Sequence, residues 1–511
     1  MITRNGVIAA GHDKTAEAAT LVMEAGGNAF DAAVAALCAA CVAEPVLASL
    51  GGGGFLLAKT PTGEPLLYDF FTQTPRQKRS EPETDLYPVL VDFGDAIQEF
   101  HIGMGAIATP GAIAGLFAVH RALCRLPLRE LVAPAVACAR NGIALNPFQQ
   151  HIATIVEPIL RASEDSFAPH ASPSRPSQLA NAGETVRQPD LADSLEALAH
   201  EGAGLFYEGD WGERLIRDCA DGGGHLGMED LSAYRVVERP ALTGVYRGRR
   251  IFTNPPPALG GPLILFALRL LSEIELNACQ RGDARHLHTI ATAMKLTQQM
   301  RRDGEEGTDP EDDPLAAELL SIMRREAIFR RGTTQISIAD REGNLASLTL
   351  SNGEGTGYVL PGTGIQLNNM LGEEDINPHG FHKWPPNRRI SSMMSPTLLD
   401  LGNGNWVVTG SSGSNRIRSA ILQVLCNLVD FGLPLEEAVA APRAHYEGNL
   451  LHLEPPVSKE ALTALGDQWP RIKRWNGTSV FFGGAHSISL GPRGELVGAG
   501  DPRRGGVVRY V

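Results

Sequence analysis

The sequence predicts a mixed protein of the α+β class, and two observations carry that prediction. Up to about residue 330, the apolar residues recur mostly at helical spacing, with a few short runs typical of strands. From Thr333 onward, apolar and polar residues alternate as they do in half-buried strands. A helix-rich part therefore meets a strand-rich part between Gly332 and Thr333, and no internal repeat is visible in either.

The first part opens with two predicted helices over residues 14–43. An amphipathic run from Thr15 ends at Gly26-Gly27, and an alanine-rich run follows Asn28. After Gly51–Gly54, apolar runs at 55–58 and 66–69 predict a hairpin. Further helices are expected at 109–142, 190–221, 262–299 and 315–330, with a surface loop at 163–189. In the second part, strands are expected at 335–340, 344–351, 406–410 and 487–490, and helices near 415–431 and 434–440.

Length and charge narrow the class of protein. The 511 residues predict about three domains at about 150 residues each, or one large enzyme fold. A net charge of −13 without a long basic run argues against nucleic acid as a partner. The apolar run Ala32–Leu47 is too short to span a membrane and contains Glu44 and Pro45. We expect a protein without a membrane partner.

The seven cysteines and the acidic segments argue for a reduced, metal-free protein. The cysteines are dispersed among alanine and leucine, which is typical of buried thiols, and the N-terminus lacks a leader-like apolar core. We therefore expect a cytoplasmic location. The acidic stretch 303–314 lacks the ligand spacing of a calcium loop, so no metal site is expected.

Most residues whose side chains could take part in a reaction lie after Gly332, in the strand-rich part of the sequence. Gly332-Thr333-Thr334 alone is an ordinary strand start. Hydroxyl-bearing and glycine-rich segments follow it, namely Thr349 to Ser351, Asn368-Asn369, Ser391-Ser392 and Thr409 to Ile417. These surrounding segments distinguish this Gly-Thr-Thr sequence from an ordinary strand start.

In the order of these motifs, the chain resembles the γ-glutamyltranspeptidase (glutathione hydrolase) family of N-terminal nucleophile hydrolases. The matching segments are 26–35, 51–55, 109–111, 134–142, 230–235, 255–261, 333–334, 391–392 and 501–503. The resemblance implies a four-layer αββα sandwich shared by two fragments as one structural domain. It also implies chemistry that needs no cofactor.

The resemblance further implies a proenzyme that cleaves itself. Thr333 would attack the carbonyl of Gly332, giving a large fragment, 1–332, and a small one, 333–511, which associate as a heterodimer; any higher oligomer stays open. The new α-amine, with a pKa of about 7.7–8.0, could serve as the general base of Thr333. Gly332 suits this bond because it places no side chain in the way.

The supporting roles follow position by position. Thr349 and Ser351 correspond to hydroxyls beside the nucleophile. Gly413 and Ser414 correspond to the backbone donors of the oxyanion hole. For the substrate, Ser391 and Ser392 correspond to the serine pair that binds a carboxylate, and Asn352 stands in for a family asparagine.

The sequence departs from the family where the substrate's head group is bound. Phe71 replaces the arginine that holds the substrate carboxylate, and Met370 and Glu373 replace the glutamine and aspartate on the amino side. Gln335 replaces a histidine. Either another arginine (Arg76, Arg388 or Arg416) binds the substrate carboxylate, or the enzyme accepts a different acyl group.

Three functions follow from this comparison of motifs. The first is a hydrolase or transferase of γ-glutamyl, glutathione-like amides that forms an acyl-enzyme on Thr333, with water, an amino acid or a peptide as acceptor. The second is an amidase on the same machinery with another acyl specificity, like glutaryl (cephalosporin) acylase or oxamate amidohydrolase. The third is a non-catalytic relative.

Overall fold

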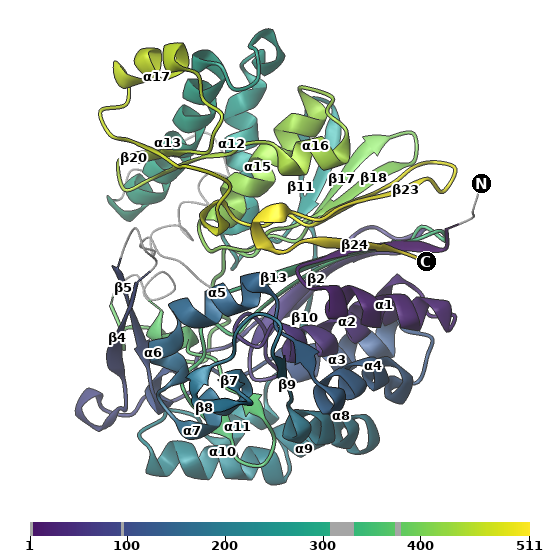
Figure 1. The fold of residues 1–511 in the computed structure, drawn as a ribbon, viewed down its shortest axis with the longest axis vertical. Helices are drawn as coiled ribbons and strands as arrows, with labels where there is room; N and C mark the ends of the chain where they lie inside the picture. The colour runs from purple at the N-terminus through teal and green to yellow at the C-terminus, as the bar shows by residue number, and fades with distance from the viewer. Residues whose placement is uncertain (1–3, 93–96, 307–331, 374–379) are drawn as a thin grey trace.

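The computed structural model describes residues 4–92, 97–306, 332–373 and 380–511. Most of the acidic stretch 303–314 and the helix predicted at 315–330 lie outside the described residues. Two antiparallel sheets lie against each other, and helices cover their outer faces (Figure 1). The chain is therefore a mixed helix and sheet protein, as the sequence predicts.

The first sheet has seven strands, and strands from before and after Gly332 meet at its centre. Its order is β10 (Val237–Pro240), β3 (Leu66–Phe70), β2 (Gly53–Lys59), β14 (Leu345–Ser351), β13 (Thr334–Asp340), β1 (Gly6–Ala10) and β24 (Val507–Tyr510). Every residue of β13 and β14 is buried. The centre of this sheet therefore combines strands from before and after Gly332.

The second sheet has six strands and packs on the first. Its order is β11 (Leu242–Tyr246), β12 (Arg249–Thr253), β17 (Thr397–Gly402), β18 (Asn405–Thr409), β22 (Ser487–Leu490) and β23 (Leu496–Ala499). β13 contacts β18 and β22, and β1 contacts β22 and β23. An apolar core between the sheets includes Phe55 and Leu57 from the first sheet and Leu398 and Val408 from the second. Burial of these side chains stabilises the stack by roughly 1.5–3 kcal/mol for each large apolar residue.

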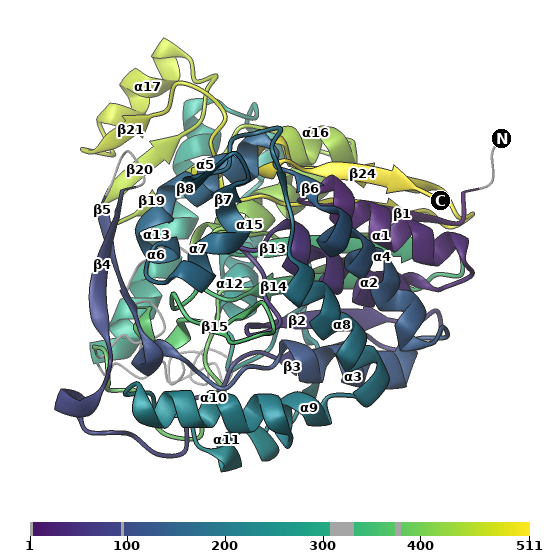
Figure 2. The same ribbon diagram turned by 60° about the horizontal axis from the view of Figure 1, so that its bottom comes forward.

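Helices cover the outer face of the first sheet, as the turned view in Figure 2 shows. They are α1 (Asp13–Glu24), α2 (Ala29–Ala43), α3 (Ala112–Leu123), α4 (Leu128–Asn141) and α8 (Pro189–Glu201). All of α2 is buried, because it contacts α1, α3 and α4 as well as β13 and β14. Its alanine-rich, apolar composition fits a helix enclosed on every side. A capping box between Asn28 and Asp31 begins it.

Another group of helices covers the second sheet. These are α12 (Gly260–Ser272), α13 (Ala284–Glu306), α15 (Arg416–Val429), α16 (Leu435–Ala440) and α17 (Lys459–Gly466). α12 contacts β11, and α16 contacts β22 and β23. Beside α17 lies a small sheet of β19 (Ala444–Glu447), β20 (Leu450–Leu453) and β21 (Ile472–Arg474). No helix among the described residues combines the length and apolar character that crossing a membrane requires.

Smaller elements complete the side of the molecule near the first sheet. They are β4 (Tyr87–Asp92), β5 (Ile97–Ile102), β6 (Ile143–Ala144), α5 (Pro147–Ile155), α6 (Glu157–Leu160), α7 (Glu164–Phe167), β7 (Ala171–Ser172), β8 (Arg175–Leu179), β9 (Thr185–Val186), α9 (Gly204–Tyr207), α10 (Asp210–Asp221), α11 (Met228–Ser232), β15 (Val359–Leu360) and β16 (Ile365–Gln366).

One local prediction was wrong. Residues 163–189 are not simply a loop, because they form α7 and the short strands β7, β8 and β9. The helical region expected at 262–299 consists of two helices, α12 and α13. In the segment between them, Gly282 has a φ of +85°, a left-handed conformation that favours glycine. The hairpin of β2 and β3, and the helices α1, α2, α15 and α16, agree with the sequence predictions.

Candidate active site

Thr333 lies at the buried start of β13. Its side chain is 1% exposed. The β13–β14 register pairs Thr334 with Leu350, and continuing it by one residue places Thr333 opposite Ser351. Ser351 in turn pairs with Gly53 of β2. The structure therefore brings together the residue that the sequence predicts as nucleophile and one of its two predicted hydroxyl partners.

The backbone of Gly332 is held on both sides. Ser351 Oγ donates a hydrogen bond of 2.6 Å to the Gly332 carbonyl oxygen. The Gly332 N–H donates one of 2.7 Å to Glu354 Oε1. A Cβ at Gly332 would lie 2.7 Å from the Gly353 carbonyl oxygen, so a side chain would crowd this position. A hydroxyl thus polarises the carbonyl that Thr333 would attack, while a carboxylate holds the preceding N–H.

Thr349 lies on the same strand as Ser351 but has a different partner. Its Oγ1 donates a 2.6 Å hydrogen bond to Gln335 Oε1. Gln335 Nε2 donates to Ser347 Oγ at 3.0 Å and to Ser337 Oγ at 3.2 Å. Gln335, which replaces the family histidine, therefore organises a buried hydroxyl network beneath the start of β13.

Glu44 is a buried carboxylate beside the nucleophile that the sequence analysis noted only as an interruption of an apolar run. Its Oε2 accepts a 2.7 Å hydrogen bond from Thr334 Oγ1, and its Oε1 accepts one of 2.8 Å from Thr15 Oγ1. Burial raises the pKa of Glu44 to about 7, although the two hydroxyl donors favour its ionised form. A lone carboxylate in an alanine-rich run is the sequence signal that could have marked it.

Gly413 and Ser414 form the turn that leads into α15. Their φ angles are +108° and +57°, both in the left-handed region. The Arg416 N–H donates to the Gly413 carbonyl at 3.1 Å, and the Ile417 N–H donates to the Ser414 carbonyl at 2.9 Å. The segment before the turn lies against β14 and β13. Ser347 Oγ of β14 donates to the Thr409 carbonyl at 2.8 Å, and a Cβ at Gly410 would lie 2.2 Å from Gln335 Oε1 of β13. Successive backbone N–H groups in such a turn at a helix start suit a developing negative charge.

The other predicted substrate residues lie around the neighbouring segments. Ser391 Oγ is buried and has no hydrogen-bond partner among the described residues. Ser392 Oγ accepts from the Met394 N–H at 3.1 Å. Asn352 Nδ2 donates to Gln366 Oε1 at 3.4 Å. Glu373 is buried beside Gly353, where a Cβ would collide with its Oε1.

Phe71 lies in the apolar core between the sheets. Its ring stacks on Phe55 with centroids 5.3 Å apart, and none of its surface is exposed. Its carbonyl oxygen accepts a 2.6 Å hydrogen bond from the Tyr234 hydroxyl and another from Arg389. Arg389 also lies 3.6 Å from Asp69. Arg389, to which the sequence pattern assigns no role, thus holds the end of β3 through these contacts.

The three arginines proposed as replacements lie in different places. Arg388 is exposed, and Arg76 lies 3.6 Å from the exposed Glu229. Arg416 is 3% exposed and lines a cavity of about 260 Å³. The cavity residues come from both sides of the texture change and are Val46, Leu47, His151, Ile152, Ile155, Val156, Gly332, Glu354, Arg416, Trp475, Ser479, Val480, Phe481 and Arg504. Of the three, Arg416 is thus the one beside the predicted cleavage site.

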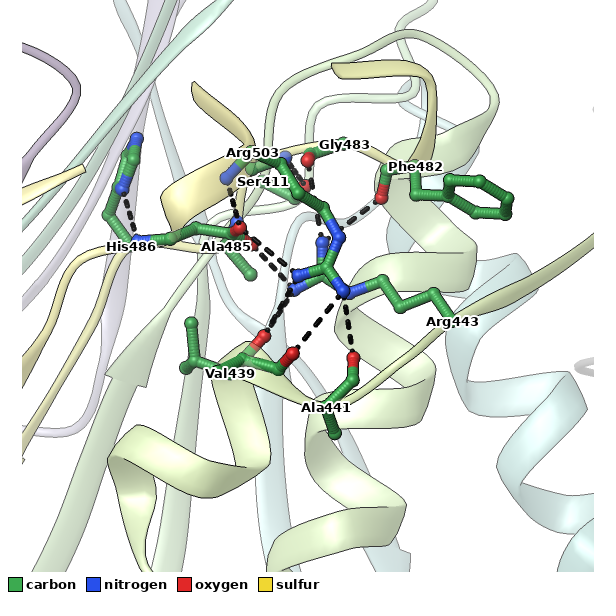
Figure 3. Close-up of polar contacts among 12 residues, drawn as sticks. Ser411, Val439, Ala441, Arg443, Phe482, Gly483, Ala485, His486 and Arg503 are labelled. Atoms are coloured by element: carbon green, nitrogen blue, oxygen red, sulfur yellow. Dashed lines mark hydrogen bonds and ion pairs between the residues drawn. The ribbon is translucent and has the colours of Figure 1, made fainter. Parts of the chain in front are cut away.

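A buried network of ion pairs and hydrogen bonds joins the end of α16, the segment 482–486 and the segment 501–503 (Figure 3). Arg443 Nη2 lies 2.6 Å from Asp501 Oδ2, and Arg503 Nη2 lies 2.5 Å from Glu454 Oε2. Burial opposes ionisation of Asp501, but Arg443 and Arg503 lower its pKa to about 2. The Asp501 to Arg503 motif is therefore structural in this chain.

The chain is similar to known proteins over nearly its whole length. The family model described as gamma-glutamyltranspeptidase matches residues 15–326 and 320–511. The chain is 30% identical to the glutathione hydrolase proenzyme of Escherichia coli (strain K12), over 98% of this chain and 90% of that protein. It is also 30% identical to the acylase ACY 1 proenzyme of Pseudomonas sp. (strain V22), over 97% of this chain and 91% of that protein.

A solved structure is similar along the same length. The crystal structure of cephalosporin acylase from Bacillus halodurans superposes with a TM-score of 0.84 at 25% identity, covering 99% of this chain and 96% of that one. The matches run through the β13–β14 ladder, the turn before α15 and the Asp501 to Arg503 network alike. The chain is an enzyme that belongs to the gamma-glutamyltranspeptidase family.

Proposed function

We propose that the protein is a self-cleaving, threonine-dependent amide hydrolase and acyltransferase. The observation that carries this proposal is the way Ser351 and Glu354 hold the two sides of Gly332 next to Thr333. A carbonyl that already accepts a 2.6 Å hydrogen bond is prepared to carry the negative charge of a tetrahedral intermediate.

In the cleavage step, Thr333 Oγ bonds to the Gly332 carbonyl carbon as the Gly332–Thr333 C–N bond breaks. The hydroxyl proton passes to the Thr333 nitrogen, and an ester remains. Water then hydrolyses the ester, which gives a carboxylate at Gly332 and a free α-amine and hydroxyl at Thr333. The free amine becomes the base that activates Thr333 for turnover.

This mechanism assigns a fold and a subunit composition to the chain. The two stacked sheets and their outer helices fit the four-layer αββα sandwich of N-terminal nucleophile hydrolases. Fragments 1–332 and 333–511 would remain together as a heterodimer, because β13 lies between β14 and β1 and all three strands are buried. Gly413 and Ser414 would supply the backbone donors of the oxyanion hole.

The substrate is an amide, for which two acyl classes are open. The relatives named glutathione hydrolase favour a γ-glutamyl amide, with water, an amino acid or a peptide as the acceptor. The burial of Phe71 in the core, where the resemblance implies a carboxylate-binding arginine, favours an acylase of different specificity. The proteins named acylase ACY 1 and cephalosporin acylase give this second class equal support.

Purified wild type and Thr333→Ala protein test the proposal. Wild type should separate on a denaturing gel into two pieces, and the smaller piece should begin at Thr333. Thr333→Ala should stay at 54.6 kDa and hydrolyse neither γ-glutamyl- nor glutaryl-p-nitroanilide. The matched variant Thr333→Ser retains a hydroxyl and should still cleave, more slowly. An uncut wild-type chain, or activity in Thr333→Ala, would reject the assignment.

A further inference from the structure

The residue that follows the turn at Gly413 and Ser414 is held by a carboxylate from another element. Asn415 stands at the N-cap of α15, where an asparagine normally accepts a backbone N–H of the first helical turn. Its side chain makes no such bond here. Instead, Asn415 Nδ2 donates a 2.9 Å hydrogen bond to Glu447 Oε1 at the end of β19. The asparagine is therefore drawn away from the helix and tied to β19.

The orientation of the Asn415 side chain depends on Glu447. Asn415 Oδ1 is buried and has no hydrogen-bond partner among the described residues. Asn415 is also fully buried, so an amide that lost Glu447 would have no water at hand to replace it. A change at Glu447 would therefore remove the hydrogen bond that fixes this side chain, directly beside the proposed oxyanion donors.

His445 lies between Glu447 and α15. Its Nε2 lies 3.4 Å from Glu447 Oε2, and its Nδ1 lies 2.8 Å from Ser419 Oγ. An ionised carboxylate only accepts, so Nε2 carries the ring proton and Nδ1 accepts from the Ser419 hydroxyl. The chain of hydrogen bonds runs from Ser419 on α15, through His445 and Glu447, to Asn415 at the start of the same helix.

The charges of this chain are fixed by its surroundings. Burial opposes the ionisation of Glu447, but His445, Arg416 and Arg418 lower its pKa to about 2. Burial lowers the pKa of His445, so the ring is neutral above pH 7. An ionised carboxylate and a neutral imidazole give one fixed pattern of donors and acceptors, which suits a support for a neighbouring turn.

Ser419, His445 and Glu447 have the residue types of a hydrolase triad but not its geometry. In such a triad, the histidine Nε2 faces the serine and Nδ1 faces the carboxylate. Here the ring has the opposite orientation. Ser419 also lies inside α15 and is 4% exposed, so a substrate could not reach it. These three residues therefore support the start of α15 and do not form a second active site.

We propose that Glu447 is a positioning residue for turnover, which acts through Asn415 to fix the turn that binds the oxyanion of the substrate. This inference rests on the proposed function, in which Gly413 and Ser414 supply the backbone donors. Such donors stabilise the oxyanion when they are held in place before the reaction, and a displacement of about 1 Å can lower the rate about 10²-fold. Self-cleavage should depend on Glu447 less, because the Gly332 carbonyl already accepts a hydrogen bond from Ser351.

Glu447→Ala separates turnover from cleavage. The variant should still be cut before Thr333 but should lose about 10–100-fold in kcat, with KM nearly unchanged, on γ-glutamyl- or glutaryl-p-nitroanilide. Glu447→Gln should retain most of the wild-type kcat, because its amide keeps an acceptor for Asn415 and can donate to the other tautomer of His445. The matched control Glu436→Ala removes an exposed carboxylate of α16 and should leave kcat unchanged.

Asn415→Ala tests the path of the effect. Because it removes the same hydrogen bond, it should lower kcat as Glu447→Ala does, and the double variant should lose no more than either single one. Additive losses, a wild-type kcat in Glu447→Ala, or cleavage that slows as much as turnover would overturn the proposal. If Glu447→Ala does not fold, Asn415→Ala decides alone, and a wild-type kcat in that variant would overturn the proposal as well.

The wild-type protein distinguishes this inference from the function on which it rests. A wild type that stays uncut, or that hydrolyses neither substrate, would reject the proposed function and this inference with it. A wild type that is cut and active but insensitive to both Glu447→Ala and Asn415→Ala would reject this inference alone.

Discussion

Two strand ends on the same edge of the central sheet have opposite characters. At the start of β13, Gly332, Ser351 and Glu354 are joined by hydrogen bonds of 2.6 and 2.7 Å. At the end of β3, Phe71 stacks on Phe55 inside the apolar core. Phe70 pairs with Gly54, Gly54 with Leu350, and Leu350 with Thr334, so the two strand ends lie on one line across the sheet. Along one edge of a sheet, a hydrogen-bonded polar cluster and a packed aromatic pair can therefore stand only a few strands apart.

The largest effect is expected at the polar end, from Ser351→Ala. This variant removes the hydroxyl that donates to the Gly332 carbonyl, so cleavage should slow by about 10²–10³, the effect of losing one oxyanion donor. A time course of fragment appearance on a gel measures it. Ser351→Thr, which retains the hydroxyl, should cleave at close to the wild-type rate. Equal rates for all three proteins would show that Ser351 only fills space.

The apolar end should respond to Phe71→Arg through stability. A guanidinium placed against Phe55 would be buried in an apolar core, which should destabilise the fold by about 3 kcal/mol or more. Phe71→Leu, which keeps an apolar side chain, should lower the free energy of unfolding by less, roughly 1–1.5 kcal/mol. Urea denaturation measures both. If Phe71→Arg folds normally and gains γ-glutamyl activity, the end of β3 belongs to the substrate pocket and not to the core.

Glu44 should make the stability of the polar end depend on pH. Its pKa rises from 4.5 in the unfolded chain to about 7 in the folded one, so the folded state holds the extra proton between these values. Its contribution is thus fully present below about pH 4.5 and is lost as the pH rises through 7, by about 3 kcal/mol at most.

The variant Glu44→Gln isolates this contribution. The difference in unfolding free energy between wild type and Glu44→Gln should shift in favour of Glu44→Gln from pH 5 to pH 8. Taking this difference removes the pH-dependent contributions of other titratable groups to the free energy of unfolding. One such group is His486, whose pKa is lowered to about 4 by burial. A difference that stays constant with pH would show that Glu44 titrates alike in both states.

The smallest effect is expected for Gln335→Leu. The change removes the acceptor of Thr349 Oγ1 and the donor to Ser347 Oγ, leaving buried hydroxyls to find other partners. The loss should be about 1–3 kcal/mol in thermal or urea unfolding. Gln335→His, which restores the family residue, is the control. A larger loss for Gln335→His would mean that the glutamine is adapted to its present neighbours.

Much of the fold was predictable because it depends on local patterns. The apolar composition of α2, with Gly26-Gly27 before it, predicts a buried helix, and the alternation in β13 and β14 predicts paired strands. The breaks inside 262–299 and the short strands within 163–189 were missed. These features depend on a few backbone angles and contacts that a periodic pattern does not record.

The sequence by itself determined the family, the change of texture at Gly332 and the set of residues expected around Thr333. Only the tertiary structure decided which side chains meet. Glu44 and Thr334 are 290 positions apart, Arg504 reaches the cavity of Gly332 from near the C-terminus, and Phe71 lies in the core. Local periodicity specifies helices and strands, whereas burial and pairing arise when distant segments pack. The sequence therefore indicates which residues belong to the site, and only the tertiary structure shows which of them are in contact.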